Sequence, residues 1–186
     1  SPNTATALLE TGFRIDSSIA SQRFDFFLSF GSKKKIKFLN APRLPYRTNR
    51  NNIFIRGQSN LVEIPPSATI IPFAGTTMRI MPKITSYHQK ILHLEAKLNR
   101  KPVVFIIHPN EIIDESYEPR IIKRRSDNVI AYVLSDLLRA KLKTKNLGEN
   151  ALPLYEQLIL YYINKGYTFT TMQEYVSLNE GKISNL

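Results

Sequence analysis

The residue with the clearest capacity for chemistry is His108, which directly follows the apolar run 103–107. Such a run of β-branched and aromatic residues is typical of a strand that is buried on both faces. In parallel α/β folds the carboxyl ends of the strands form the edge at which ligands bind, and an imidazole titrates close to neutral pH. The position therefore indicates a general acid or base, with a surface histidine that caps a strand as the alternative.

A second polar group, Asp16, follows the short strand expected at 13–15. If the two strands share one edge of a sheet, the carboxylate would orient the His108 imidazole and stabilise its protonated form. His108 would then serve as a general acid near neutral pH. A Ser-His-Asp triad with Ser17 or Ser18 is the weaker alternative, because neither serine lies in a nucleophile elbow.

Segment 41–47 and Glu63 offer groups that could bind a polar substrate. Arg43 and Tyr46 would present a guanidinium and a phenol to sugar hydroxyls or carbonyl oxygens, with a basic surface turn as the alternative. Glu63 lies inside the strand expected at 61–64, and a buried carboxylate needs a partner. It therefore either takes part in a polar site or pairs with an arginine for structural reasons.

The elements that must position these residues alternate between helix and strand along the chain, which indicates an α/β fold. Gly12 and Gly166 are placed to end two of the helices, and Thr171 with Glu174 forms a capping box that opens the last one. The expected helices are 4–11, 84–100, 127–143, 152–165 and a short one from 171 onward. Strands are expected at 13–15, 61–64, 68–71, 103–107 and 167–170.

The helix expected at 84–100 carries one apolar stripe, because its apolar residues recur at intervals of three and four. His88 and His93 lie on the same helix but five residues apart, which puts them on different faces. A helical metal-binding pair needs a spacing of three or four, so both are expected to be surface or packing residues. The stripe consists of Ile84, Tyr87, Ile91, Leu94 and Leu98.

The composition narrows the class of protein. The 186 residues and the hydrophobic content of 42% suit one globular domain with a substantial core. No apolar run approaches the roughly 20 residues that a membrane-spanning helix needs, so no transmembrane segment is expected. The sequence contains no cysteine, which excludes disulfides and thiolate metal sites, and it contains no glycine-rich phosphate-binding loop. The cellular compartment stays open.

The net charge of +11 is concentrated at 33–37, 123–125 and 139–145. Such an excess favours an anionic polymer as partner, which could be an acidic glycan, a nucleic acid or an anionic membrane surface. A set of solvated loops and helix faces would give the same composition. In the last turns of the helix expected at 127–143, cations also complement the helix dipole.

Five segments together resemble, in order and spacing, polysaccharide deacetylases of the NodB-like group, the carbohydrate esterases of the family 4 type. The likeness covers residues 1–178, as the carboxyl-terminal portion of a single deacetylase barrel domain, and leaves 179–186 as a tail. It is closest to the branch whose members carry a His-Pro-Trp-Glu sequence, with Asn110 in place of the tryptophan. The segments are 12–19, 41–47, 61–65, 79–82 and 102–111.

The resemblance implies the later half of a distorted (β/α) barrel in a hydrolase that removes acetyl groups from N-acetylated sugars of a polysaccharide. In such enzymes a divalent metal, usually zinc, polarises the acetyl carbonyl and a bound water. His108 matches the general acid, and Asp16 matches the residue that assists it. Substrate-binding positions are matched by Arg43, Tyr46, Glu63 and Glu111.

The metal ligands and the catalytic base of that family have no counterpart in these 186 residues. The resemblance implies that they lie upstream of Ser1, so the chain is expected to be one part of a longer deacetylase with a glycan substrate. A non-catalytic glycan-binding relative of the same fold is the first alternative, and a basic nucleic-acid-binding module is the second. A homo-oligomer is also left open.

Overall fold

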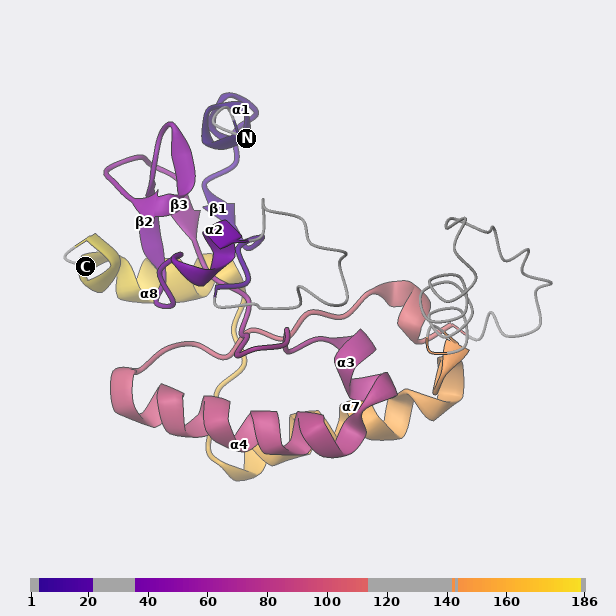
Figure 1. The fold of residues 1–186 in the computed structure, drawn as a ribbon. Helices are drawn as coiled ribbons and strands as arrows, with labels where there is room; N and C mark the ends of the chain where they lie inside the picture. Colours follow the sequence, from indigo (N-terminus) through magenta and orange to yellow (C-terminus); the bar gives the residue numbers. More distant parts are fainter. Residues whose placement is uncertain (1–3, 22–35, 114–141, 143, 185–186) are drawn as a thin grey trace, which may run out of the picture. The chain divides into compact units, whose positions relative to one another are not determined.

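The computed structural model describes residues 4–21, 36–113, 142 and 144–184 (Figure 1). The chain divides into two compact units. Unit 1 comprises Ser1–Phe73, His88–Phe105 and Tyr167–Leu186, and unit 2 comprises Ala74–Tyr87 and Ile106–Gly166. The basic cluster 123–125 and almost all of the helix expected at 127–143 lie outside the described residues.

Unit 1 contains a small mixed sheet with the strand order β1-β4-β2-β3. Strands β1 (Ile15–Asp16) and β4 (Val62–Glu63) are parallel. Strand β2 (Tyr46–Asn49) is antiparallel both to β4 and to β3 (Asn52–Arg56). The expected α/β class is therefore confirmed, and the parallel pair joins two segments that are far apart in the sequence.

Helices lie against the sheet of unit 1. Helix α1 (Thr4–Glu10) contacts β3, helix α8 (Met172–Ser184) contacts β2, and the short helix α2 (Ile36–Leu39) precedes β2 (Figure 1). As expected, α1 ends at Gly12, whose φ of 89° is left-handed. The Phe13 N–H then donates to the Leu8 carbonyl at 2.9 Å, a bond that closes a helix C-terminus of the Schellman type.

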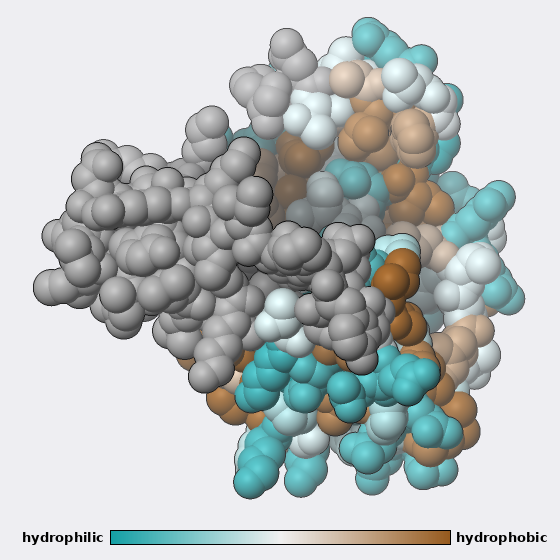
Figure 2. Space-filling model, turned by 90° about the vertical axis from the view of Figure 1, so that its right-hand side faces the viewer, coloured by the Kyte–Doolittle hydropathy of each residue, from teal (hydrophilic) through white to brown (hydrophobic). Residues whose placement is uncertain are grey.

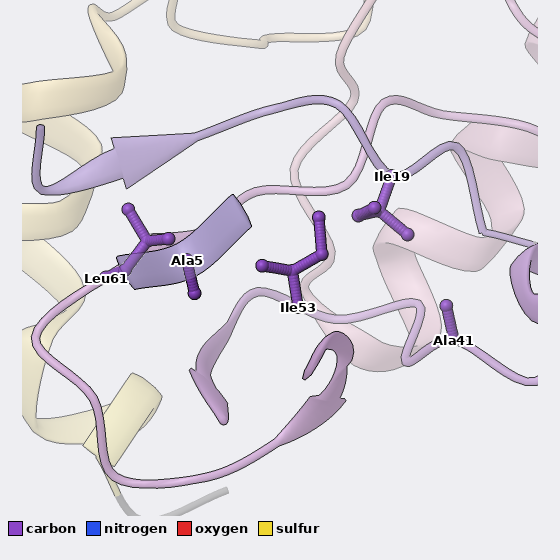
Figure 3. Packing of buried hydrophobic residues seen from close by; sticks show 5 residues of the cluster. All are labelled: Ala5, Ile19, Ala41, Ile53 and Leu61. Atoms are coloured by element: carbon purple, nitrogen blue, oxygen red, sulfur yellow. The ribbon is translucent and has the colours of Figure 1, made fainter. Parts of the chain in front are cut away.

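An apolar core holds these elements together. Its buried residues come from α1, from β3 and from the segments that flank β1, β2 and β4 (Figure 3). Leu8, Leu9, Phe38 and Phe54 pack against it. Because the core draws on both ends of this sheet, the short two-residue strands β1 and β4 are kept in register by packing as well as by their hydrogen bonds. The buried residues are Ala5, Ile19, Ala41, Ile53 and Leu61.

Unit 2 is helical in its described part. Helix α3 (Gly75–Ile80) contacts α7 (Leu152–Asn164), which in turn contacts the 3-10 turn η5 (Gly148–Asn150). As expected, α7 ends at Gly166, which has a φ of 77°. A further 3-10 turn, η3 (Pro109–Glu111), follows His108 directly.

Helix α4 (Pro82–Asn99) has the expected extent, but its apolar stripe does not form the buried face. All five stripe residues are exposed, from 47% for Ile84 to 87% for Leu98. The buried residues are instead Thr85, His88, Gln89, Leu92 and His93. The periodic pattern predicted the helix itself, but it did not show which face of the helix contacts the rest of the protein. Figure 2 likewise shows hydrophobic residues lying open beside hydrophilic ones on the face that it displays.

Three expected strands are not regular strands. Residues 103–107 form an extended, half-buried segment, so the expectation of a strand buried on both faces is wrong. Its ladder bonds are few: the Ser67 N–H donates to the Val104 carbonyl at 2.9 Å, and Ile106 forms an isolated parallel bridge with Ala74. Segment 68–71 forms only an isolated bridge, and 167–170 is irregular.

The boundary expected at residue 178 falls inside α8, which continues to Ser184. Two contacts explain why the helix continues: Ile183 is buried, and Glu180 pairs with Arg47 at 3.2 Å. In addition, the Glu174 N–H donates to the Thr171 side chain at 3.1 Å, which confirms the expected cap of this helix. Among the described residues, no helix combines the length and the apolar character that crossing a bilayer requires.

Candidate functional site

The sheet of unit 1 brings together three of the candidate site residues, which come from three separate segments. Asp16 on β1 and Glu63 on β4 are direct partners in the parallel register, and Tyr46 on β2 is the partner of the same Glu63 in the antiparallel register. Residues that face each other across neighbouring strands project to the same side of a sheet. Asp16, Glu63 and Tyr46 therefore form one polar row across the strands β1, β4 and β2.

The two serines after Asp16 orient its carboxylate. The Ser17 N–H donates to Oδ1 at 2.9 Å, and the Ser18 hydroxyl donates to Oδ2 at 2.8 Å. The Ser17 hydroxyl donates in turn to the Ile64 carbonyl at 2.8 Å, which ties this turn to β4. These serines therefore position Asp16. Both of their hydroxyls already donate hydrogen bonds, which does not suit a nucleophile.

Glu63 is fully buried next to Asp16. Its Oε1 accepts the Ile19 N–H at 2.8 Å, whereas its Oε2 is buried without a hydrogen bond from any described residue. Burial, reinforced by the neighbouring Asp16 charge and opposed by the Ile19 N–H, raises the pKa of Glu63 to about 8. Glu63 is therefore mostly a neutral acid at pH 7, and a proton on Oε2 would turn this atom into a donor toward Asp16.

This raised pKa makes stability depend on pH. Between pH 5 and 8 the folded protein keeps a proton on Glu63 that the unfolded chain, with the ordinary pKa of 4.5, has released. The free energy of unfolding should therefore fall as the pH rises through this range, by up to about 3 kcal/mol. Urea unfolding at pH 5, 6, 7 and 8 measures it. Glu63→Gln should flatten the dependence, exposed Glu10→Gln should leave it unchanged, and equal slopes in all three proteins would contradict it.

Tyr46 is buried and donates its hydroxyl to the Ile53 carbonyl at 2.5 Å. Burial, together with the acidic Glu63 and Asp16, raises the pKa of its phenol. The phenol is therefore neutral and fixed at the centre of the sheet. This contact gives Tyr46 a structural role, and its role in substrate binding stays a prediction.

Arg43 anchors its own segment in unit 1. Its Nε and Nη2 donate to the two oxygens of Glu95 at 2.6 and 2.5 Å, and its Nη1 donates to the Ala68 carbonyl at 2.8 Å. Lys101 lies 3.5 Å from the same carboxylate. Burial alone would raise the pKa of Glu95, but the hydrogen bond from Arg43 and the charges of both cations hold it below its ordinary value. This bidentate pair keeps the proline-stiffened segment in place.

His108 lies in unit 2, where its side chain is exposed and its backbone is held by Glu111. The Glu111 carboxylate is buried and accepts the His108 N–H at 3.1 Å and the Thr76 hydroxyl at 2.5 Å. It also pairs with buried Arg79 at 3.2 Å. Gly75 leaves room for this network, because a Cβ there would clash with the Glu111 Oε2. Glu111 thus positions the segment that carries His108.

The supporting residues Gly75, Thr76 and Arg79 were not expected as part of a site. Arg79 stands in the segment 79–82 that carries the resemblance, which was the one available signal. Asp16 belongs to unit 1 and His108 to unit 2, so the pairing of these two residues stays a prediction.

The described residues do not form a metal centre by themselves: they contain no group of three or more His, Cys, Asp or Glu side chains that could hold an ion. As expected, the two histidines of α4 are packing residues. His88 packs edge-on against Phe73, and burial lowers its pKa to about 4, with Arg43 and Lys101 adding to the effect. The His93 Nδ1 lies 3.0 Å from the Tyr167 hydroxyl.

Comparison with protein-family models, with curated proteins and with solved structures found no match for this chain. The functional assignment therefore depends on the residues themselves and on the arrangement described above.

Proposed function

We propose that this chain is the carboxyl-terminal part of a metal-dependent polysaccharide deacetylase, a hydrolase that removes acetyl groups from N-acetylated sugars. The observation that carries the proposal is the row of Asp16, Glu63 and Tyr46 across β1, β4 and β2. Each residue comes from a different segment of the resemblance, and segments that build one site must converge in space. The parallel pair β1–β4 is the kind of pairing that a distorted (β/α) barrel requires.

The chemistry of the proposal assigns His108 a single proton transfer. Water adds to the acetyl carbon, the bond between that carbon and the sugar nitrogen breaks, and the products are acetate and a free amine. An amine is a poor leaving group unless it is protonated, so His108 donates a proton to the departing nitrogen. An exposed imidazole on a backbone fixed by Glu111 suits this role. Asp16 would assist His108.

The metal, usually zinc in the related enzymes, would polarise the acetyl carbonyl when it is bound. The described residues do not fit such an ion, and we propose that its ligands and the catalytic base lie upstream of Ser1. We therefore assign to this chain only the proton donor, its assisting carboxylate and the elements that hold them.

The test is acetate release by the full-length protein from oligosaccharides of N-acetylglucosamine and N-acetylgalactosamine. We expect acetate release that a metal chelator reduces by at least about tenfold and that added zinc restores. Acetate release that persists undiminished after complete metal removal would contradict the metal-dependent reaction.

A non-catalytic glycan-binding relative is the second candidate. It is favoured by the engagement of Arg43, Tyr46 and Glu111 in structural contacts, which would preserve the fold without any reaction. The same assay separates the two candidates, because this relative would bind the oligosaccharides and release no acetate.

A further inference from the structure

The hairpin β2–β3 and the residues after it border two adjoining depressions on unit 1. The first has a volume of about 280 Å³ and is lined by Arg47 and Arg56. The second has a volume of about 680 Å³ and is lined by Arg14 and Arg50. Both share the lining residues Gly57, Gln58 and Asn60, and we term the two depressions together the hairpin surface.

The polar groups of the hairpin surface are of two kinds. Four arginines supply guanidinium groups, and none of the described residues that line either depression carries a carboxylate. Four side-chain amides stand beside them, those of Asn49, Asn51, Gln58 and Asn60. Guanidinium groups match carboxylates through paired hydrogen bonds, and amides both donate to and accept from hydroxyls. A ligand that carries carboxylates on a frame of hydroxyls would satisfy both kinds of group.

The backbone beneath these side chains is ordered by its own hydrogen bonds. The Gly57 N–H donates to the Arg47 carbonyl at 2.9 Å, and the Ser59 N–H donates to the Thr48 carbonyl at 3.0 Å. Gly57 is required at its position, because a Cβ there would lie 2.5 Å from the Asn49 Cα. The surface is therefore formed before any ligand binds, which reduces the entropy lost on binding.

The arginines differ in how firmly they are held. Arg47 is half-buried and pairs with Glu180 at 3.2 Å. Arg14 donates through Nη1 to the carbonyls of Leu9 and Phe13 at 3.3 and 3.1 Å, which orients its guanidinium. Arg50 and Arg56 are exposed at the two ends of the hairpin. Because both are exposed, these two are the residues to change in the test.

We propose that the hairpin surface binds an acidic glycan, a chain of sugars that carry carboxylates. Single-stranded nucleic acids are normally held by aromatic side chains on which bases stack. Among the described residues that line the two depressions, Tyr46 is the only aromatic one, and it is 1% exposed. The lining therefore favours an acidic sugar over a base. Binding here needs neither His108 nor a metal, so the proposal can be tested separately from deacetylation.

The experiment measures binding of the full-length protein to a fluorescent oligosaccharide of galacturonic acid and to the matching oligosaccharide of galactose. We expect the acidic chain to bind at least about tenfold more tightly, and the double variant Arg50→Gln/Arg56→Gln to lose about tenfold or more of that affinity. The double variant Lys83→Gln/Lys97→Gln, which removes two exposed cations from α4, is the matched control and should change the affinity by less than about twofold. Thermal unfolding verifies that the variants fold.

Three results would overturn the proposal. Equal affinity for the acidic and neutral chains would show that the surface does not recognise the carboxylates. An equal loss of affinity in Lys83→Gln/Lys97→Gln and in Arg50→Gln/Arg56→Gln would show that the effect comes from overall charge. Displacement of the acidic glycan by a single-stranded oligonucleotide that binds more tightly would identify the surface as a nucleic-acid site.

Discussion

Replacing His108 with alanine in the full-length protein should lower kcat for acetate release by about 10²- to 10⁴-fold and change KM little. The reason is that, in the proposed reaction, the side chain acts only when the bond to the sugar nitrogen breaks. His108 is exposed, and the substitution keeps the bond that its backbone N–H donates to Glu111. Steady-state kinetics measured from acetate release would separate kcat from KM.

The control for this prediction is Asn110→Ala, which changes an exposed side chain in the 3-10 turn that follows His108. It should leave kcat within about threefold of the wild-type value, since Asn110 takes no part in proton transfer. A wild-type kcat in His108→Ala would show that His108 is not the general acid. Equal losses in both variants would assign the effect to the shape of the turn.

Replacing Glu111 with alanine should lower the free energy of unfolding by about 3–5 kcal/mol at pH 7. The Arg79 guanidinium, 3% exposed, would lose its carboxylate partner, and the Thr76 hydroxyl would lose its acceptor. Arg79 keeps the bond from Nη1 to the Lys145 carbonyl at 2.7 Å, which favours the lower end of this range. The midpoint and slope of urea unfolding measure the change.

Two variants make this result interpretable. Glu111→Gln keeps an acceptor oxygen for Thr76 and for the His108 N–H, so it should cost less than Glu111→Ala. Exposed Glu149→Ala removes the same charge elsewhere in unit 2 and should cost under about 0.5 kcal/mol. A loss in Glu111→Ala no greater than that in Glu149→Ala would show that the buried network does not stabilise unit 2.

Local signals in the sequence predicted the helix ends well. Gly12 and Gly166 adopt the left-handed conformation that ends a helix, and Thr171 caps α8, because each signal acts within a few residues. The buried face of α4 could not be predicted, since a periodic pattern does not show which side of the helix packs against other parts of the protein. The run 103–107 was misread because apolar composition alone does not show whether neighbouring strands exist on both sides.

The candidate site was predictable only in part. The resemblance selected Asp16, Tyr46 and Glu63, which do lie in register in the sheet. It gave no sign that Arg43 pairs with Glu95, because partners 52 residues apart leave no local pattern in one sequence. The support of Glu111 by Arg79 and Thr76 is hidden for the same reason. These contacts give Glu111 a positioning role, and its role in substrate binding stays a prediction.

The most direct test of the account is to quantify both products of the reaction. The full-length protein, incubated with an N-acetylated oligosaccharide, should release acetate and expose free amines in equal amounts, and His108→Ala should do so at least about 100-fold more slowly. Binding of the oligosaccharide without release of either product would contradict the account and identify the protein as a glycan-binding relative.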